Sequence, residues 1–199
     1  MPNRDHRHHP APPAPVFPAR PNLTLIGMPG SGKSIVGRII ATRLGWDFID
    51  TDKVIEAAHG KPLQEIVHEL GGEEFRRAEE RAVLELDPPR PTVIATGGSV
   101  VYSEAAMEHL ASLATLVFLD APTEVIQRHV EGEAPRGIVG MPEGGIEALH
   151  RERLPLYQRH ATVVVRTSHE PPEEEAENVL AALRNAGALA HPAGASPIP

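Results

Sequence analysis

Cysteine is absent from this chain of 199 residues, and long apolar segments are absent as well. Without cysteine, the chain can form no disulfide framework, no thiolate metal site and no cysteine nucleophile. No apolar run approaches the length that spans a membrane, and the N-terminus lacks the apolar core of a signal peptide. We therefore expect a cytoplasmic protein with no membrane partner. Positive charge is in deficit too: the net charge is −8, which argues against a nucleic-acid partner because a duplex repels an acidic surface.

The two ends of the chain have the composition of tails. Residues 1–21 are rich in Pro, Ala, Arg and His and show no periodicity, so they are predicted to be disordered. The three histidines of this segment could bind a transition metal, but a solvated polar arm is the simpler interpretation. Gly187 is expected to end the last helix, and residues 187–199 form the predicted flexible C-terminal tail. The predicted folded unit is therefore residues 22–186, enough for one α/β domain with a core.

The most informative segment is a Gly-rich stretch with the spacing G-x-x-x-x-G-K-[ST]. It runs from Gly27 to Ser34, between an apolar strand predicted at residues 23–26 and a helix predicted from the spacing of apolar residues. A phosphate-binding loop requires this order, because glycine lets successive N–H groups converge on phosphate oxygens and the helix start adds partial positive charge. The alternative is a glycine-rich turn that merely caps a helix, but such a turn would not need a lysine and a serine at the last two positions of this motif. The chain is therefore predicted to bind a nucleoside triphosphate.

Individual positions of this loop have predicted roles. Lys33 is expected to reach the β- and γ-phosphates, and the Ser34 hydroxyl is expected to bind Mg²⁺ directly. The predicted ATP-binding residues of the loop are Gly30, Ser31, Gly32, Lys33, Ser34 and Ile35.

Short apolar strands alternate with helical segments through the rest of the folded unit. Strands are predicted at residues 23–26, 46–49, 92–95, 115–119 and 162–166, and the longer helices at residues 73–86, 104–110, 123–130, 144–153 and 172–186. This alternation is typical of a parallel sheet covered on both faces. The predicted fold is therefore α/β, a three-layer P-loop kinase fold with a five-stranded parallel sheet.

Carboxylates and glycines follow two of the predicted strands at their carboxyl ends, where ligands bind in open α/β sheets. After the second strand, Asp50 is placed to orient Mg²⁺ through its waters, and Asp52 is placed to bind the acceptor hydroxyl and could take its proton. Helix capping by Thr51 or Asp52 would explain one polar residue here but not both carboxylates. The third strand runs into Gly97 and Gly98, where either a ligand approaches the backbone closely or the chain simply turns.

The predicted helix at residues 73–86 carries three arginines. Arg76 lies off the apolar stripe. It could either bind an acceptor carboxylate through two parallel hydrogen bonds or form a surface salt bridge. Arg77 and Arg81 are spaced to pair with neighbouring glutamates. The predicted buried stripe consists of Phe75, Ala78, Ala82 and Leu86.

These motifs, taken in order, resemble the shikimate kinase family. They read Gly-x-x-Gly-Ser-Gly-Lys-Ser, Phe-Ile-Asp-Thr-Asp, Gly-Glu-Glu-Phe-Arg-Arg-x-Glu, Ala-Thr-Gly-Gly and Arg-x-Pro-Leu-Tyr, and the resemblance covers about residues 23–183. It implies a monomeric enzyme of the chorismate pathway of aromatic amino acid biosynthesis. Its activity would be ATP-dependent phosphorylation of shikimate to shikimate 3-phosphate, with ATP as co-substrate and Mg²⁺ as cofactor.

The resemblance also implies roles for single residues. Arg136 resembles the arginine of a lid that closes over the ATP phosphates, and glycines in residues 131–141 give that lid its predicted mobility. Asp50 would serve the outer shell of the metal. The implied shikimate-binding residues are Asp52 for the hydroxyls, Arg76 and Arg153 for the carboxylate, and Gly98 for the ring. The implied catalytic residues are Lys33, Asp52 and Arg136.

Three departures from the family pattern leave other functions open. Ser99 replaces the last of three glycines, and the lid reads Arg-Gly-Ile-Val at residues 136–139, with His129 before it where an arginine is common. An arginine often found near the adenine falls at residues 169–170, which are His-Glu. One alternative is a divergent paralogue that phosphorylates another small hydroxy acid or a polyol such as gluconate. The other is a nucleotide-binding regulator without turnover.

Overall fold

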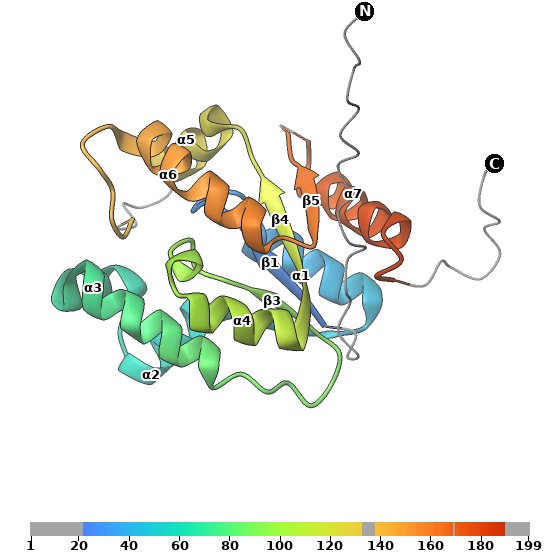
Figure 1. Cartoon of the computed structure of the whole chain (residues 1–199), viewed down its shortest axis with the longest axis horizontal. Helices are drawn as coiled ribbons and strands as arrows, with labels where there is room; N and C mark the ends of the chain where they lie inside the picture. The colour runs from blue at the N-terminus through green and yellow to red at the C-terminus, as the bar shows by residue number, and fades with distance from the viewer. Residues whose placement is uncertain (1–21, 133–137, 169, 190–199) are drawn as a thin grey trace, which may run out of the picture.

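The structure is a computed structural model that describes residues 22–132, 138–168 and 170–189. Within these residues the strands are β1 (Asn22–Ile26), β2 (Asp47–Asp50), β3 (Thr92–Ala95), β4 (Ala114–Asp120) and β5 (Val163–Arg166). All pair in parallel, in the order β2-β3-β1-β4-β5, which confirms the predicted five-stranded parallel sheet. Leu25 of β1 pairs with Ala95 on one side and with Val117 on the other. β1 is therefore central (Figure 1), and because the strands run parallel, the loops after β1, β2 and β3 leave the sheet at the same end.

Helices cover both faces of this sheet, which gives the predicted three layers (Figure 1). They are α1 (Lys33–Leu44), α2 (Thr51–His59), α3 (Leu63–Leu84), the 3-10 helix η1 (Val100–Tyr102), α4 (Glu104–Leu113), α5 (Thr123–Gly132), α6 (Gly145–His160) and α7 (Pro172–Asn185). β4 alternates between the faces: Val117 packs in a core with α1 and α7, whereas Phe118 packs in a core with α4 and α6. In the described part of the chain, no helix is long and apolar enough to span a bilayer.

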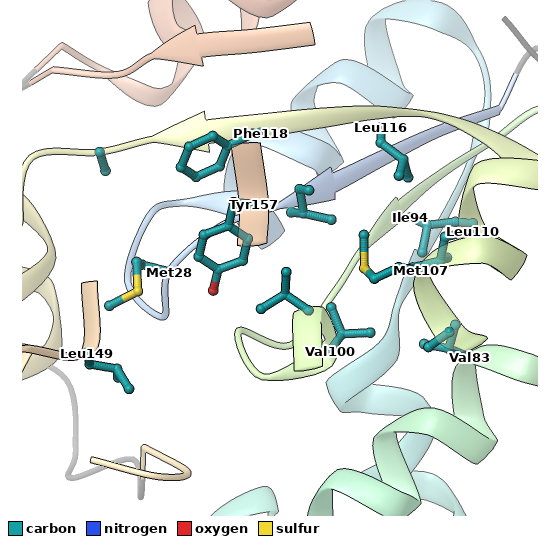
Figure 2. Packing of buried hydrophobic residues seen from close by; sticks show 14 of the residues in the cluster. Met28, Val83, Ile94, Val100, Met107, Leu110, Leu116, Phe118, Leu149 and Tyr157 are labelled. Carbon is teal, nitrogen blue, oxygen red and sulfur yellow. The ribbon is translucent and has the colours of Figure 1, made fainter. Parts of the chain in front are cut away.

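The core beneath α4 and α6 extends to the edge of the sheet where the predicted site lies. Figure 2 shows Phe118 and Tyr157 stacked near Met28 of the phosphate-binding loop, and the two ring centroids are 5.0 Å apart. The buried Tyr157 hydroxyl donates a 2.6 Å hydrogen bond to the Gly98 carbonyl. A buried tyrosine needs such a partner, and this one ties α6 to the loop after β3.

α3 contains the helix predicted at residues 73–86, preceded by a second helical segment. It begins at Leu63, and Gly71 interrupts it with a φ of 72° and a ψ of 172°. Ala82 of the predicted buried stripe is only half-buried, while the other three positions are buried and Val83 joins them in the core. The predicted start at residue 73 therefore agrees with the start of the second segment, after Gly71, while the helix ends at Leu84 rather than at residue 86.

α6 also differs, since the predicted helix at residues 144–153 ends too early. The helix continues to His160 with Pro155 inside it. A proline inside a helix removes a backbone donor and clashes with the preceding turn. Leu149 and Tyr157 are nonetheless completely buried on the face of α6 that covers the sheet. Tertiary packing therefore outweighs the local preference of Pro155.

A third, small core joins α2 and α3 to the turn after α5. Ile55, Ile66 and Phe75 form it together with Val139, and all four are buried. Val139 belongs to the predicted lid segment, so the C-terminal end of that segment is packed against the α2–α3 pair.

We expect Gly37→Ala to destabilise the fold by roughly 1–3 kcal/mol, because α1 lies directly on the sheet at this position. A Cβ at Gly37 would lie 2.9 Å from Phe48 Cε2 and 3.1 Å from Leu25 Cδ1. Urea-induced unfolding followed by circular dichroism measures the effect. Gly72→Ala is the matched control, since a Cβ there would meet only Val139 Cγ1, at an ordinary 3.7 Å. Equal unfolding midpoints for the two variants would contradict the prediction.

Candidate active site

The predicted phosphate-binding loop connects β1 to α1. Gly27 has a φ of 147°, and a Cβ on it would lie 2.8 Å from the Leu119 carbonyl oxygen of β4, so the loop leaves the sheet where a side chain cannot fit. Gly32, with a φ of 87°, is the N-cap of α1, and no side chain caps this helix start. The N–H groups of the first turn of α1 are therefore left for an anionic ligand, as the sequence predicts.

Lys33 is the first residue of α1, and its ammonium lies within the loop. It donates hydrogen bonds to the carbonyls of Gly27 at 2.9 Å and Met28 at 2.7 Å, and the residue is only 7% exposed. Burial lowers the pKa of Lys33 to about 8, and the charge on Arg153 adds to this effect. The opposing charges on Asp52, Asp50 and Glu79 raise the same pKa, so these carboxylates lie close enough to act on the ammonium.

The two aspartates at the carboxyl end of β2 have different positions in the fold. Asp50 is the N-cap of α2 and accepts a 3.1 Å hydrogen bond from the backbone N–H of Asp52. The predicted capping alternative therefore holds for Asp50, and not for Thr51 or Asp52. The Thr51 hydroxyl instead accepts a 3.1 Å bond from the N–H of Gly97, which joins the ends of β2 and β3. The Asp52 carboxylate faces Gly97, since a Cβ there would lie 2.9 Å from Asp52 Oδ1.

Gly98 is required by packing within the protein. A Cβ on Gly98 would lie 2.6 Å from Pro29 Cδ and 3.0 Å from the Pro29 nitrogen, so the loop after β3 touches the phosphate-binding loop directly. Its carbonyl accepts hydrogen bonds from Tyr157 and, at 3.0 Å, from Arg153 Nη1. Neither predicted alternative, ligand approach or a plain turn, included this contact between the two loops.

Arg76 of α3 and Arg153 of α6 converge on the ring of Tyr102. Their guanidinium carbons lie 4.3 Å and 5.0 Å from the ring centroid. Arg153 is almost completely buried, and it donates to the Tyr102 hydroxyl at 3.2 Å and to the Val139 carbonyl at 2.6 Å. Arg76 is half-buried, and its buried Nε has no hydrogen-bond partner among the residues that the structure describes. The structure thus brings together two cations that are 77 positions apart in the sequence.

The salt-bridge alternative applies to the neighbour of Arg76 instead. Arg77 is exposed and forms the expected ion pair with Glu74, at 2.5 Å. The described residues give no ion pair for Arg76, whose planar group stacks on Tyr102.

Comparison with known proteins identifies the family of the chain. A family model described as shikimate kinase matches residues 29–184. The chain belongs to the shikimate kinase family. The shikimate kinase of Thermobifida fusca is 41% identical over 170 residues, which cover 85% of this chain and 98% of that protein. The shikimate kinase of Mycobacterium avium is 40% identical over 154 residues, which cover 76% of this chain and 87% of that protein.

Solved shikimate kinases share the fold. The enzyme from Acinetobacter baumannii, determined in complex with shikimate, aligns with a TM-score of 0.78 at 29% identity and covers 87% of this chain and 98% of that one. The enzyme from Aquifex aeolicus aligns with a TM-score of 0.71 at 30% identity, over 83% of this chain and 98% of that one. The predicted α/β P-loop kinase fold is confirmed.

One buried carboxylate beside the predicted site residues was not predicted from the sequence. Glu79 of α3 is 2% exposed and accepts a hydrogen bond from the Ser99 hydroxyl. Burial, together with the charge on Asp52, raises the pKa of Glu79 to about 7, against the opposing effects of the Ser99 hydroxyl and of Arg153. The signal was present, because Glu79 follows Arg76 by nearly one helical turn and is the last residue of the Phe-Arg-Arg-x-Glu motif.

Some predicted residues lie outside the part of the chain that the structure describes. They are Arg136, which the family pattern makes the lid arginine, His169 before the last helix, and the two tails at residues 1–21 and 190–199. Tyr102, which stacks against both arginines, was not predicted at all, since nothing in its local sequence distinguishes it.

Proposed function

We propose that this chain transfers the γ-phosphoryl group of ATP to a hydroxyl of shikimate and so forms shikimate 3-phosphate. Membership in the shikimate kinase family supports an ATP-dependent kinase. The observation that carries the assignment is the convergence of Arg76 and Arg153 on Tyr102, beside the carboxylates that act on Lys33. A kinase for an acidic acceptor needs cations for the carboxylate at a fixed distance from its phosphate-binding loop.

The nucleotide half of the site consists of the loop after β1 and the start of α1. The uncapped N–H groups of α1 and the Lys33 ammonium provide positive charge for the β- and γ-phosphates. Ser34 and Asp50 offer oxygen atoms of the kind that Mg²⁺ binds, and Asp50 is held in place by its bond to the backbone of Asp52. Mg²⁺ held there would neutralise charge on the phosphates. Lys33 supports the negative charge that develops during transfer.

The acceptor half of the site consists of the ends of β2 and β3 together with α3 and α6. We infer that Asp52 binds the acceptor hydroxyl and takes its proton as the phosphoryl group arrives. Arg76 and Arg153 bind the acceptor carboxylate, with charge-assisted hydrogen bonds from the two planar groups. The ring of the acceptor lies against the backbone at Gly98. Because Gly98 touches Pro29, the two halves of the site share one wall.

Water has to be excluded while the phosphoryl group moves, since otherwise the enzyme would hydrolyse ATP. We infer from the family pattern that residues 131–141 close over the nucleotide with Arg136 toward the phosphates. The described end of this segment is joined to a proposed acceptor-binding residue, because the Val139 carbonyl accepts a hydrogen bond from Arg153. This bond supports coupling between closure of the segment and binding of the acceptor. We also propose that the enzyme is a monomer and acts in the cytoplasm.

A coupled assay of ADP release with shikimate, with gluconate and with no acceptor tests the proposed function. We expect ADP release with shikimate to exceed both other rates by on the order of 100-fold or more. Gluconate also carries a carboxylate, but its open chain must be ordered before carboxylate and hydroxyl are presented together, whereas the ring of shikimate holds them at a fixed separation. Phosphorus NMR of the product identifies the phosphate ester. Faster turnover of gluconate would point to a divergent paralogue, and ADP release that no acceptor stimulates would contradict a kinase.

A further inference from the structure

Ser99 stands where the family pattern has a third glycine, and the structure gives its side chain a partner. The hydroxyl donates a hydrogen bond to Glu79 Oε2, and both residues are buried. The backbone at Ser99 has a φ of −96° and a ψ of −6°, which any residue can adopt, so glycine is not required here. The serine therefore adds a hydrogen bond between the loop after β3 and α3 without straining the chain.

This bond determines which way the Glu79 carboxylate faces. With Oε2 engaged by Ser99, Oε1 lies against Gly97, where an added Cβ would collide with it. The same Cβ would lie 2.9 Å from Asp52 Oδ1. Two carboxylates, from α3 and α2, thus flank one glycine at the carboxyl end of β3. The proposed function places the acceptor hydroxyls at this point.

We propose that Ser99 is a positioning residue for phosphoryl transfer, because its hydroxyl holds Glu79 with Oε1 turned toward the acceptor hydroxyls beside Asp52. The inference rests on the proposed function and goes beyond it by naming the group that orients this second carboxylate. Without the hydroxyl, Glu79 keeps its buried place on α3 but loses the donor that fixes its orientation and favours its ionised form.

The charges around Glu79 set the direction of the expected effect. The charges on Asp52 of α2, Arg76 of α3 and Arg153 of α6 act on Glu79. The charge on Glu79 in turn raises the pKa of Lys33 of α1 and of Tyr157 of α6. Burial raises the pKa of Glu79 to about 7, and the Ser99 hydroxyl works against this rise. Removal of the hydroxyl must therefore raise the pKa of Glu79 further, so that a larger fraction is protonated at neutral pH.

The test is the pH dependence of kcat/KM for shikimate in Ser99→Ala and Ser99→Gly. We expect the acid limb of the profile to move up by roughly one pH unit in both variants, because a hydrogen bond to a charged group changes an ionisation equilibrium about tenfold. Ser99→Thr, which keeps the hydroxyl, should keep the wild-type limb. In a Glu79→Gln background, Ser99→Ala should cause no further shift, since the two residues act as one unit.

Ser103→Ala is the matched control. Ser103 Oγ also donates to a glutamate of α3, Glu80 Oε2, at 2.6 Å, and the same oxygen caps α4. The change removes a bond of the same kind beside the site and should lower Tm, as the loss of a helix cap does. It should leave the acid limb unmoved.

Two results would overturn the proposal: an acid limb that stays in place in folded Ser99→Ala and Ser99→Gly, or a shift that persists in the Glu79→Gln background. Failure of the wild type to phosphorylate shikimate would overturn the proposed function, and this inference with it. Shikimate turnover by the wild-type enzyme tests the proposed function without any variant. Its failure is therefore distinguishable from an unexpected pH profile of the Ser99 variants.

Discussion

Lys33→Ala should lower kcat/KM for ATP by about 10³-fold or more, because the ammonium is the side-chain cation inside the loop that receives the triphosphate. With a pKa of about 8, Lys33 is mostly protonated at pH 7, so its charge is present where phosphate charge develops. Coupled assays at varied ATP measure the loss. The fold should survive, since removal of a buried charge partly offsets the lost bonds to the carbonyls of Gly27 and Met28.

Two further variants make this result specific. Lys33→Met keeps the length of the side chain and should lose as much activity as Lys33→Ala, which would separate charge from packing. Lys53→Ala removes a lysine on α2 that is exposed and ion-paired with Glu56 at 2.6 Å, and it should leave kcat/KM near the wild-type value. Activity within tenfold of wild type in a Lys33 variant with unchanged circular dichroism would refute the assignment of the loop.

The parts of the site that could be predicted from the sequence are those that depend on local structure. The loop from Gly27 to Ser34 was predictable because its glycines, lysine and helix start lie within eight consecutive residues. The five strands were predictable because a buried parallel strand is a short apolar run, and errors were of a residue or two, as at β2 (Asp47–Asp50) against residues 46–49. Local pattern and local geometry agree in these segments.

The parts that could not be predicted depend on contacts between distant segments. The motif draws attention to Glu79, but its hydrogen bond with Ser99 and its place next to Gly97, opposite Asp52, are visible only in the folded chain. Tyr102 is linked to the proposed site only because arginines from two other helices, α3 and α6, stack on its ring. Gly98 is explained by Pro29, which lies 69 positions earlier in the sequence. No periodicity or spacing rule carries information of this kind.

The two halves of the site are electrostatically linked, which affects the choice of variants. The charge on Arg153 lowers the pKa of Lys33, and the charges on Asp52 and Glu79 raise it. A change at Arg153 would therefore disturb the nucleotide half as well as the acceptor half. Arg153 also donates to the Val139 carbonyl, so its removal would loosen the end of the predicted lid segment. Arg76 is the cleaner probe of acceptor binding.

Arg76→Ala should lower kcat/KM for shikimate by roughly 30- to 1000-fold, which corresponds to about 2–4 kcal/mol of transition-state binding. The acceptor carboxylate would remain partly desolvated with only Arg153 as a partner. Among the described residues the buried Nε of Arg76 has no hydrogen-bond partner, and an acceptor carboxylate would supply one. KM for ATP should change much less, because Arg76 stacks on Tyr102 on the acceptor side and is not placed at the proposed triphosphate site. Steady-state kinetics with each substrate varied in turn separate the two effects.

Arg77→Ala is the matched control for Arg76→Ala, since it removes an arginine from the next position of α3 that is exposed and paired with Glu74. It should leave kcat/KM for shikimate close to the wild-type value. Arg76→Lys should restore only part of the loss, because an ammonium cannot reproduce the planar fork or its stacking on Tyr102. Equal losses in Arg76→Ala and Arg77→Ala would refute the role of Arg76. Brisk turnover of a neutral polyol by the wild type, with none of shikimate, would leave a small-molecule kinase whose arginines serve some other purpose than a carboxylate.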